Sequence, residues 1–369
     1  MGRRAFGSIR RLPSGRYQAR LPDGETAPVT FTTKADAARW LSSAETDLLR
    51  GTYVPRTGGS ELTVGEWVDV WHREHSLHKR PGTLARDQAA IRNHIKPLLG
   101  SVGLDRLRPQ DLQRFVAGLT DTLGPGTTHS VFAVLRAALR AAVDNDLIDR
   151  APTRGIKLPP IPKTSVQVLR PAELQRLAAA MPEPWRPMVY VAGVCGLRFA
   201  EIAALRVGRL DLPRRQINVV ETSPQVGPDR AEPKTAAGRR AVPMPAFVAS
   251  HLTSHLSSRS LRDTDALVFA AARGGRLYAG NWHGDVWKPA REAAGFPSLR
   301  FHDLRHSAVP LWVEMGANLL QVSRWLGHSS VQITADVYGH LFTETNDAVM
   351  ARLDEVFAAD QTADGGTLA

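Results

Sequence analysis

Six residues in the second half of this 369-residue chain could together act on an anionic substrate; they are Arg198, Lys234, His302, Arg305, His328 and Tyr338. A phenol, with a pKa near 10, is a poor nucleophile until nearby cations stabilise its phenolate. A guanidinium is permanently charged, and its planar fork matches two phosphate oxygens. One phenol beside two arginines therefore indicates attack on a phosphate ester, whose anionic transition state fixed donors would neutralise.

The sequence around each arginine predicts how it is positioned. Arg198 follows Gly196 at an expected helix start, where unpaired backbone N–H groups add positive potential. Arg305 comes three residues after His302, so a helix would place both side chains on one face. Apolar residues at helical spacing would anchor the Arg198 helix; they are Leu197, Ile202 and Leu205. An isolated arginine is more often an ordinary surface residue, and the surrounding motifs reverse that interpretation.

Tyr338 is the candidate nucleophile among five tyrosines. Tyr190 lies in an apolar run and is most simply a core residue. Tyr17, Tyr53 and Tyr278 have no neighbouring motif, whereas Tyr338 follows the histidine of an LGHSS segment by ten residues. A phenolic nucleophile would form a phosphotyrosine that preserves the bond energy, so no external energy source is needed. We also expect no cofactor and no metal.

Five segments follow one another in the C-terminal part: GLRFAEIAALR, EPKTAAGRRAVPMP, FHDLRHSA, LGHSS and TADVYGH. In this order and spacing they resemble the tyrosine recombinase family, also called phage-type integrases. The resemblance covers nearly all of the C-terminal part. The two preceding parts also resemble the arm-binding and core-binding domains of that family.

The resemblance implies a role for each site residue. Arg198 and Arg305 would clamp the scissile phosphate, and Tyr338 would form a covalent 3′-phosphotyrosine. Lys234, expected on or near a hairpin loop, would protonate the departing 5′ oxygen. Two histidines and one carboxylate complete the set: His302 would take the tyrosine proton or contact phosphate, His328 would donate to phosphate, and Glu201 would orient Arg198. No role is assigned to His306 or His340.

The predicted fold is multidomain. We expect a small N-terminal β-sheet plus helix domain at 1–55, an all-α core-binding bundle at 61–150, and a mixed, mainly α catalytic domain with a small antiparallel sheet at 165–358, followed by a tail at 359–369. Residues 54–60 and the proline-containing segment 151–164 are the expected linkers. In the catalytic part, INVVE and ALVFA are predicted strands, and three helical stretches are predicted between Asn281 and Val337. Pro310 would allow a kink after Arg305.

The N-terminal part alternates in strand fashion, with Tyr17, Ala19 and Leu21 on one face. The opposite face carries Arg16, Gln18 and Arg20, which could read a DNA groove. A protein-interaction module is the alternative for this small sheet. Thr33 and Asp36 predict the start of a helix packed on the sheet.

Composition and charge favour a polyanionic partner. The net charge is +11, the pI is near 10.3, and 43% of residues are hydrophobic, which indicates folded domains and nucleic acid as the first partner to consider. A solvated basic surface is the alternative for the charges of the helical part. Cys195 is the single cysteine, so neither an internal disulfide nor a multi-cysteine metal site can form. The apolar run around it is too short to cross a membrane, and we expect a cytoplasmic protein.

These observations predict a site-specific recombinase that integrates a phage or other mobile element. Its expected partners are double-stranded DNA attachment sites and three further copies of the chain in a synaptic tetramer. An apolar stripe at Val349, Leu353, Val356 and Phe357 predicts a terminal helix that packs within its own chain or on a neighbour. The sequence does not decide whether a directionality factor or a DNA-bending host protein is needed. A resolvase or type IB topoisomerase-like enzyme, or an inactive DNA-binding regulator, are the alternatives.

Overall fold

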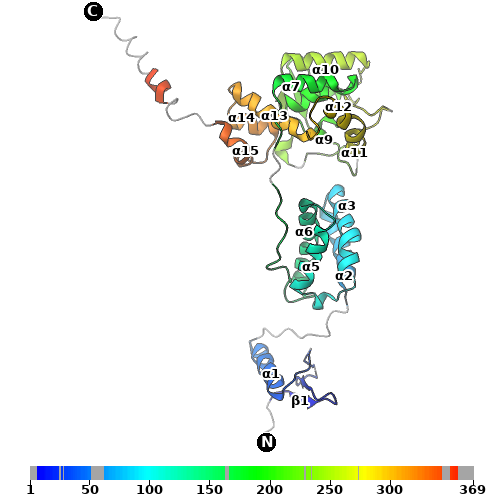
Figure 1. Cartoon of the computed structure of the whole chain (residues 1–369), viewed down its shortest axis with the longest axis vertical. Coiled ribbons are helices and arrows are strands. Elements are labelled where there is room, and N and C mark those ends of the chain that lie inside the picture. The colour runs from blue at the N-terminus through cyan, green and yellow to red at the C-terminus, as the bar shows by residue number, and fades with distance from the viewer. Residues whose placement is uncertain are drawn as a thin grey trace, which may run out of the picture. The chain divides into compact units, whose positions relative to one another are not determined.

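The computed structural model of the chain forms two compact units, residues 1–162 and 163–369 (Figure 1). The residues that the structure describes are 6–24, 26–27, 29–50, 62–162, 166–227, 230–233, 235–272, 274–342 and 350–355. Within the first unit the apolar core falls into two clusters, one before residue 50 and one after residue 60. The finer three-domain division with its bounds stays a prediction.

The N-terminal part is a hairpin covered by one helix, as predicted. Strand β1 (Ser8–Arg11) pairs antiparallel with β2 (Tyr17–Arg20), and α1 (Lys34–Leu49) packs on β2. The Thr33 hydroxyl caps α1 by accepting the Asp36 amide at 3.1 Å. Burial follows the predicted alternation, since Ala19 and Leu21 are buried while Arg20 is exposed.

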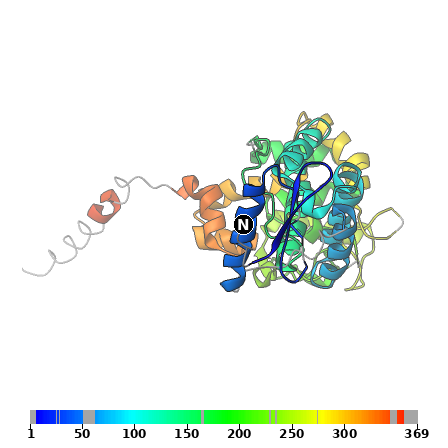
Figure 2. The same ribbon diagram turned by 90° about the horizontal axis from the view of Figure 1, so that it is seen from below.

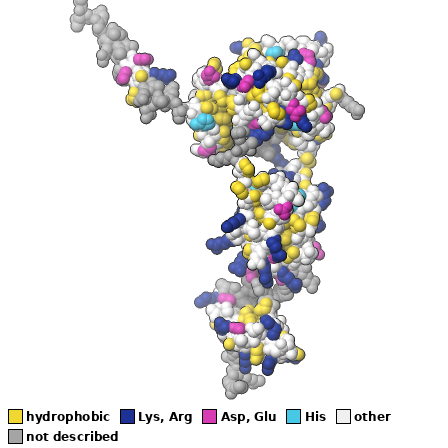
Figure 3. Space-filling view, in the orientation of Figure 1, with side chains coloured by type: hydrophobic (Ala, Val, Ile, Leu, Met, Phe, Trp, Pro, Cys, Tyr) yellow, Lys and Arg dark blue, Asp and Glu magenta, His cyan; other side chains and the backbone are white. Residues whose placement is uncertain are grey.

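The second part of this unit is all-helical. Its bounds are α2 (Val64–Glu74), η1 (His75–His78), α3 (Pro81–Ala90), a π-helical turn η2 (Ile91–Ile95), α4 (Lys96–Leu99), η3 (Leu104–Arg106), α5 (Pro109–Thr120) and α6 (Pro125–Asp144). Helix α2 begins with a capping box between Thr63 and Glu66 and buries Trp67, whose indole N–H donates to the Ala138 carbonyl at 2.7 Å. On the face shown in Figure 3, lysine and arginine side chains stand out along this bundle. The predicted helical part is therefore present, with a basic surface.

The second unit is mainly helical with a small sheet. Its helices are α7 (Pro171–Ala180), η4 (Glu183–Trp185), α8 (Arg186–Gly193), α9 (Phe199–Ile202), η5 (Val207–Arg209), η6 (Ala236–Gly238), α10 (Ala246–Ser258), α11 (Ala279–Trp282), η7 (His283–Trp287), α12 (Lys288–Ala293), α13 (Phe301–Glu314), α14 (Leu319–Leu326), α15 (Val331–Tyr338) and η8 (Gly339–Phe342). The antiparallel sheet has the order β3 (Leu210–Asp211), β4 (Gln216–Val219), β5 (Arg240–Pro243). Its core gathers around α8, which is buried after its first residue, Arg186.

Two sequence predictions about this unit were wrong. The ALVFA segment is not a strand, because its Leu267 makes only an isolated bridge with Arg206 while Val268 and Phe269 are buried in the core. A short apolar run can fill a core as a strand or as an irregular segment, so the apolar pattern does not distinguish the two conformations. The residues between Asn281 and Val337 form four helical stretches instead of three, because Gly316 at φ +88° and Gly327 at φ +65° end helices that the apolar pattern runs together.

Helices α14 and α15 pack on each other at one side of the unit, coloured orange in Figures 1 and 2. Gly327 ends α14, and a Cβ at this position would lie 2.9 Å from the Ala237 carbonyl oxygen. Helix α13 continues through Pro310 to Glu314, although proline cannot donate to the carbonyl of His306. The proline therefore does not interrupt the helix that carries Arg305.

The chain beyond η8 is described only at residues 350–355, which are helical. Leu353 is exposed there, and the other members of the predicted terminal stripe, Val349, Val356 and Phe357, lie outside the described residues, as does the tail at 359–369.

Candidate active site

Arg198 lies at the N-cap of α9, where its backbone is extended and its side chain is partly open to solvent, at 37% exposure. Its backbone N–H donates to Glu201 Oε2 at 2.8 Å, and its Nη1 donates to Glu201 Oε1 at 2.9 Å. Two residues earlier the turn into α9 requires glycine, because Gly196 adopts φ +70° and a Cβ there would lie 2.7 Å from the Trp312 ring. Glu201 thus fixes the Arg198 backbone and one guanidinium nitrogen, while part of the side chain stays open to solvent.

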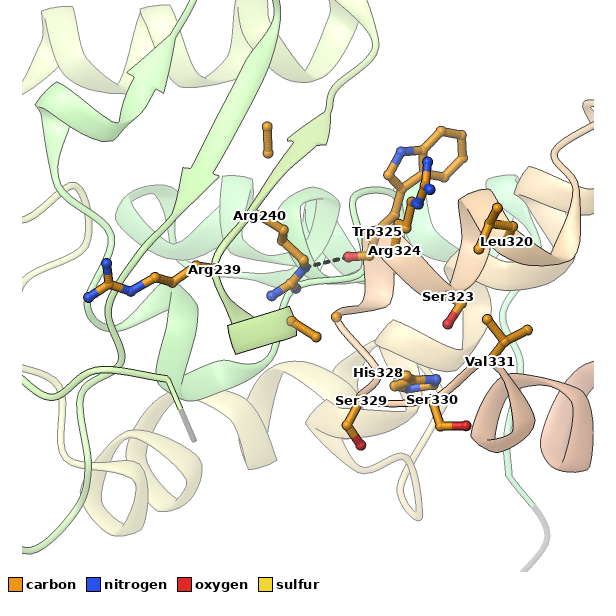
Figure 4. A pocket seen from close by; sticks show the side chains of 13 residues that line it. Arg239, Arg240, Leu320, Ser323, Arg324, Trp325, His328, Ser329, Ser330 and Val331 are labelled. Atoms are coloured by element: carbon orange, nitrogen blue, oxygen red, sulfur yellow. Dashed lines mark hydrogen bonds between the residues drawn. The ribbon is translucent and has the colours of Figure 1, made fainter. Parts of the chain in front are cut away.

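Glu201 is buried between two arginines. Besides Arg198, it binds Arg240 of β5, whose Nη1 and Nη2 donate to its two carboxylate oxygens at 2.9 Å each. Burial alone would raise the pKa of Glu201, but the hydrogen bonds and charge of Arg240, followed by the charge of Arg198, lower it to about 2. Arg240 also donates from Nε to the Trp325 carbonyl at 2.6 Å (Figure 4). The carboxylate therefore joins α9 to the sheet, and Arg240 joins the sheet to α14.

Arg305 of α13 is buried, at 3% exposure, and connects the two ends of the site. Its Nη1 donates to the Gly196 carbonyl at 2.6 Å, and its Nη2 donates to the Leu326 carbonyl. Burial and the charge of Arg198 lower the pKa of Arg305 to about 9, so it is still protonated at neutral pH. The Arg305 guanidinium thereby holds Gly196, two residues before Arg198, and Leu326, two residues before His328.

Tyr338 ends α15 and is 7% exposed. Its ring packs on Val309, Val322 and Leu326, and its hydroxyl lies 2.5 Å from His306 Nδ1. Burial raises the pKa of Tyr338 to about 12, although the charge of Arg305 opposes this. The sequence predicts that the arginines stabilise the phenolate, but in the structure burial outweighs the charge of Arg305.

His302 and His328 are close to both arginines. Burial first, and then nearby cations that include Arg305 and Arg198, lower the pKa of each histidine to about 4. His302 reaches the surface, where solvent screening weakens such effects. His328 Nδ1 lies 2.8 Å from the hydroxyl of Thr334, which orients the ring. At neutral pH both imidazoles are therefore uncharged and can each donate one hydrogen bond and accept another.

Comparison with known proteins decides the family. The phage integrase family matches residues 167–345, its N-terminal domain matches 5–50, and its N-terminal SAM-like domain matches 63–120. The putative prophage phiRv2 integrase of Mycobacterium tuberculosis H37Rv is 32% identical over 345 residues, which cover 89% of this chain and 90% of that protein.

The chain belongs to the phage integrase family. The integrase of Mycobacterium phage D29 is 28% identical, with 89% of this chain and 91% of the relative covered. The chain is accordingly a site-specific tyrosine recombinase of a mobile element, an enzyme that cleaves and rejoins DNA.

Solved structures show the same fold. The Tn1549 transposon integrase in complex with a circular intermediate DNA superposes with a TM-score of 0.67 at 19% identity, covering 80% of this chain and 100% of that one. A lambda integrase dimer bound to a COC′ core site gives a TM-score of 0.61 at 17% identity, with 94% and 99% covered. In the part of this recombinase that the structure describes, no helix combines the length and apolarity needed to cross a membrane.

The structure brings together five of the six predicted catalytic residues and Glu201, while Lys234 lies outside the described residues. Two members of the cluster were missed from the sequence. Arg240 lies at the end of the EPKTAAGRR segment, at the start of β5, where the sequence pattern predicts that a basic residue is exposed. His306 carried a usable signal, because its four-residue spacing from His302 places both rings on one face of α13, with centroids 5.2 Å apart.

A pocket of about 440 Å³ adjoins the cluster, between β5, α14 and the start of α15 (Figure 4). Arg240, Arg324 and His328 line it together with Ser329 and Ser330. These side chains supply cationic and hydroxyl donors, and Ser330 caps α15. The lining therefore suits an anionic group next to the site.

Proposed function

We propose that Tyr338 attacks the scissile phosphate of a DNA attachment site while Arg198 and Arg305 neutralise the phosphoryl oxygens. The observation that carries this proposal is the pair of hydrogen bonds from Arg305 to Gly196 and Leu326. They bring the segment of Arg198 to the segment that leads to His328 and Tyr338, more than a hundred residues later in the chain. Guanidinium, imidazole and phenol groups thus surround one place where a phosphate could bind.

Each step of the proposed reaction has a residue suited to it. As the Tyr338 Oη–P bond forms, the P–O5′ bond breaks and leaves the 3′ phosphate on the protein. Lys234 would give a proton to the departing 5′ oxygen, and His302 and His328 would donate to the phosphoryl oxygens. Attack by a 5′ hydroxyl of a second strand reverses these steps and rejoins DNA with no added energy source.

Glu201 is a positioning residue in this proposal. Its bonds to the Arg198 backbone and side chain fix the exposed guanidinium, and its pairing with Arg240 keeps the carboxylate ionised. A low pKa matters here, because a protonated carboxyl would accept fewer hydrogen bonds and hold Arg198 less firmly.

We further propose that the enzyme integrates a mobile element as a tetramer on two DNA attachment sites. The integrases of phage D29 and prophage phiRv2 support integration, because they align with nearly all of this chain. A solved lambda integrase tetramer bound to a Holliday junction, with a TM-score of 0.58, supports the stoichiometry. Whether the reaction uses a directionality factor or a DNA-bending protein is left to a two-site recombination assay with and without host extract.

The direct test is a nicked DNA substrate that carries a candidate core site, followed by mass analysis of the protein–DNA adduct. We expect DNA attached at Tyr338, and no adduct from Tyr338→Phe, which retains the buried ring. An adduct on another residue, or strand exchange by Tyr338→Phe at the normal rate, would overturn the assignment. Tyr190→Phe serves as the control because Tyr190 is a buried core tyrosine on α8.

A further inference from the structure

His306 is the side chain that the structure places on the nucleophile. Its Nδ1 lies 2.5 Å from Tyr338 Oη, and the two rings are tilted at 46° with centroids 5.8 Å apart. The imidazole is half-buried on α13, one residue beyond the clamp residue Arg305. The roles proposed above place His302, the other candidate for the tyrosine proton, on the phosphoryl oxygens and leave His306 unused.

The chemistry of the attack requires a proton acceptor at this position. Tyr338 must lose its proton while its oxygen bonds to phosphorus, and burial makes that proton hard to release. Arg305 cannot accept a proton because it is already fully protonated. A neutral imidazole with its proton on Nε2 presents a free lone pair at Nδ1, within hydrogen-bonding reach of the phenol.

The charged groups around His306 keep it neutral. Burial lowers its pKa, Asp303 opposes this, and Arg305 and Arg300 lower it further. The His302 ring stands nearly perpendicular to it, and the phenol of Tyr338 faces it from α15. A neutral histidine is available to accept a proton at physiological pH.

We propose that His306 is the general base for Tyr338, an inference that rests on the proposed function. The proton moves from Tyr338 Oη to His306 Nδ1 while the Oη–P bond forms and the P–O5′ bond breaks. The departing 5′ oxygen takes a separate proton from the acid, assigned above to Lys234. On rejoining, the imidazolium returns the proton to the phenolate oxygen, so His306 serves both half-reactions.

The test compares His306→Asn with the parent full-length enzyme. The asparagine Oδ1 can replace Nδ1 as a hydrogen-bond acceptor, but it cannot carry the proton. We expect the rate of adduct formation on the nicked substrate to fall by about 10²- to 10⁴-fold, the usual contribution of a general base. DNA binding and thermal stability should stay within the range of a matched control, His251→Asn, which changes an exposed histidine on α10.

A substrate with sulfur in place of the bridging 5′ oxygen separates a base from an acid. Thiolate leaves without protonation, so loss of the acid is rescued, whereas the His306→Asn defect should persist. The parent rate should also fall at acid pH as His306 becomes protonated, and His306→Asn should lack that change. If Asn does not fold, His306→Ala with added imidazole replaces it, and imidazole but not pyrrole should restore the rate.

The outcomes separate this inference from the proposed function. If the parent enzyme forms no Tyr338 adduct, the proposed function itself fails. If the parent forms the adduct and His306→Asn matches it within about threefold, His306 is not the base. Rescue of His306→Asn by the sulfur substrate, or of His306→Ala by pyrrole, would likewise overturn the assignment.

Discussion

Replacing Glu201 with glutamine tests whether one carboxylate holds the candidate site together. Glutamine keeps the shape of the side chain but removes the charge, which leaves Arg240 unpaired with only 6% of its side chain exposed. The pKa of Glu201 falls from 4.5 to about 2 in the folded chain. This corresponds to about 3 kcal/mol of stability at neutral pH, similar to the ~3–5 kcal/mol seen when one partner of a buried ion pair is removed.

Urea unfolding of the full-length protein at pH 7 measures this loss directly. We expect Glu201→Gln to lower the free energy of unfolding by about 3 kcal/mol and the melting temperature of the second unit by about 6–12 °C. Because the folded pKa is depressed, the stabilisation is fully present above pH 4.5 and disappears as the pH falls toward 2. The difference between parent and variant should therefore shrink over that interval.

An exposed glutamate in the same unit provides the control. Glu232 pairs with Arg239, but 78% of its side chain is exposed, so Glu232→Gln should change stability by less than about 1 kcal/mol. The double variant Glu201→Gln, Arg240→Gln should recover part of the loss, because no buried charge is then left without its partner. A loss below about 1 kcal/mol for Glu201→Gln, or the same loss at pH 3 and pH 7, would refute the reasoning.

Three further predictions concern other parts of the chain. Gly327→Ala should lower the unfolding free energy by about 2 kcal/mol and slow adduct formation, because φ is +65° and the new Cβ would lie 2.9 Å from the Ala237 carbonyl oxygen. The control Gly339→Ala should leave both quantities unchanged, because nothing lies within 4 Å of its new Cβ, and equal melting temperatures for the two variants would contradict the prediction. Lys234→Ala should stop cleavage of normal DNA yet spare a substrate with a sulfur leaving group, and equal loss on both, measured as adduct yield, would remove the acid role. Deletion from Asn346 should weaken pairing of two sites more than binding of one in gel-shift assays, and unchanged pairing would exclude a trans-acting terminal helix.

The sequence predicted well those features that rest on local pattern. Thr33 and Asp36 mark the start of α1, and the alternation around Ala19 and Leu21 gives the buried face of β2, because both depend on residues only a few positions apart. The motif residues Arg198, Arg305, His328 and Tyr338 are brought into one unit. Their order along the chain was the useful signal.

The sequence could not predict contacts that depend on the tertiary fold. Nothing near Glu201 indicates that Arg240, thirty-nine residues later, would share its carboxylate. The burial of Tyr338 also depends on Val309, Val322 and Leu326, which come from two other helices. Burial decides the sign of its pKa change, so the direction could not be read from the number of nearby arginines.

Arg198 is more accessible to solvent than Tyr338. Arg198 is 37% exposed and can meet a phosphate directly, whereas Tyr338 is 7% exposed and its phenol has a pKa of about 12. At pH 7 only about one phenol in 10⁵ would be ionised, so the free enzyme has almost no phenolate to react with. In the proposed mechanism, the Tyr338 proton must therefore leave during bond formation instead of beforehand. His306 contacts the hydroxyl, and in the proposed role of base it meets that requirement while keeping the enzyme unreactive until DNA is in place.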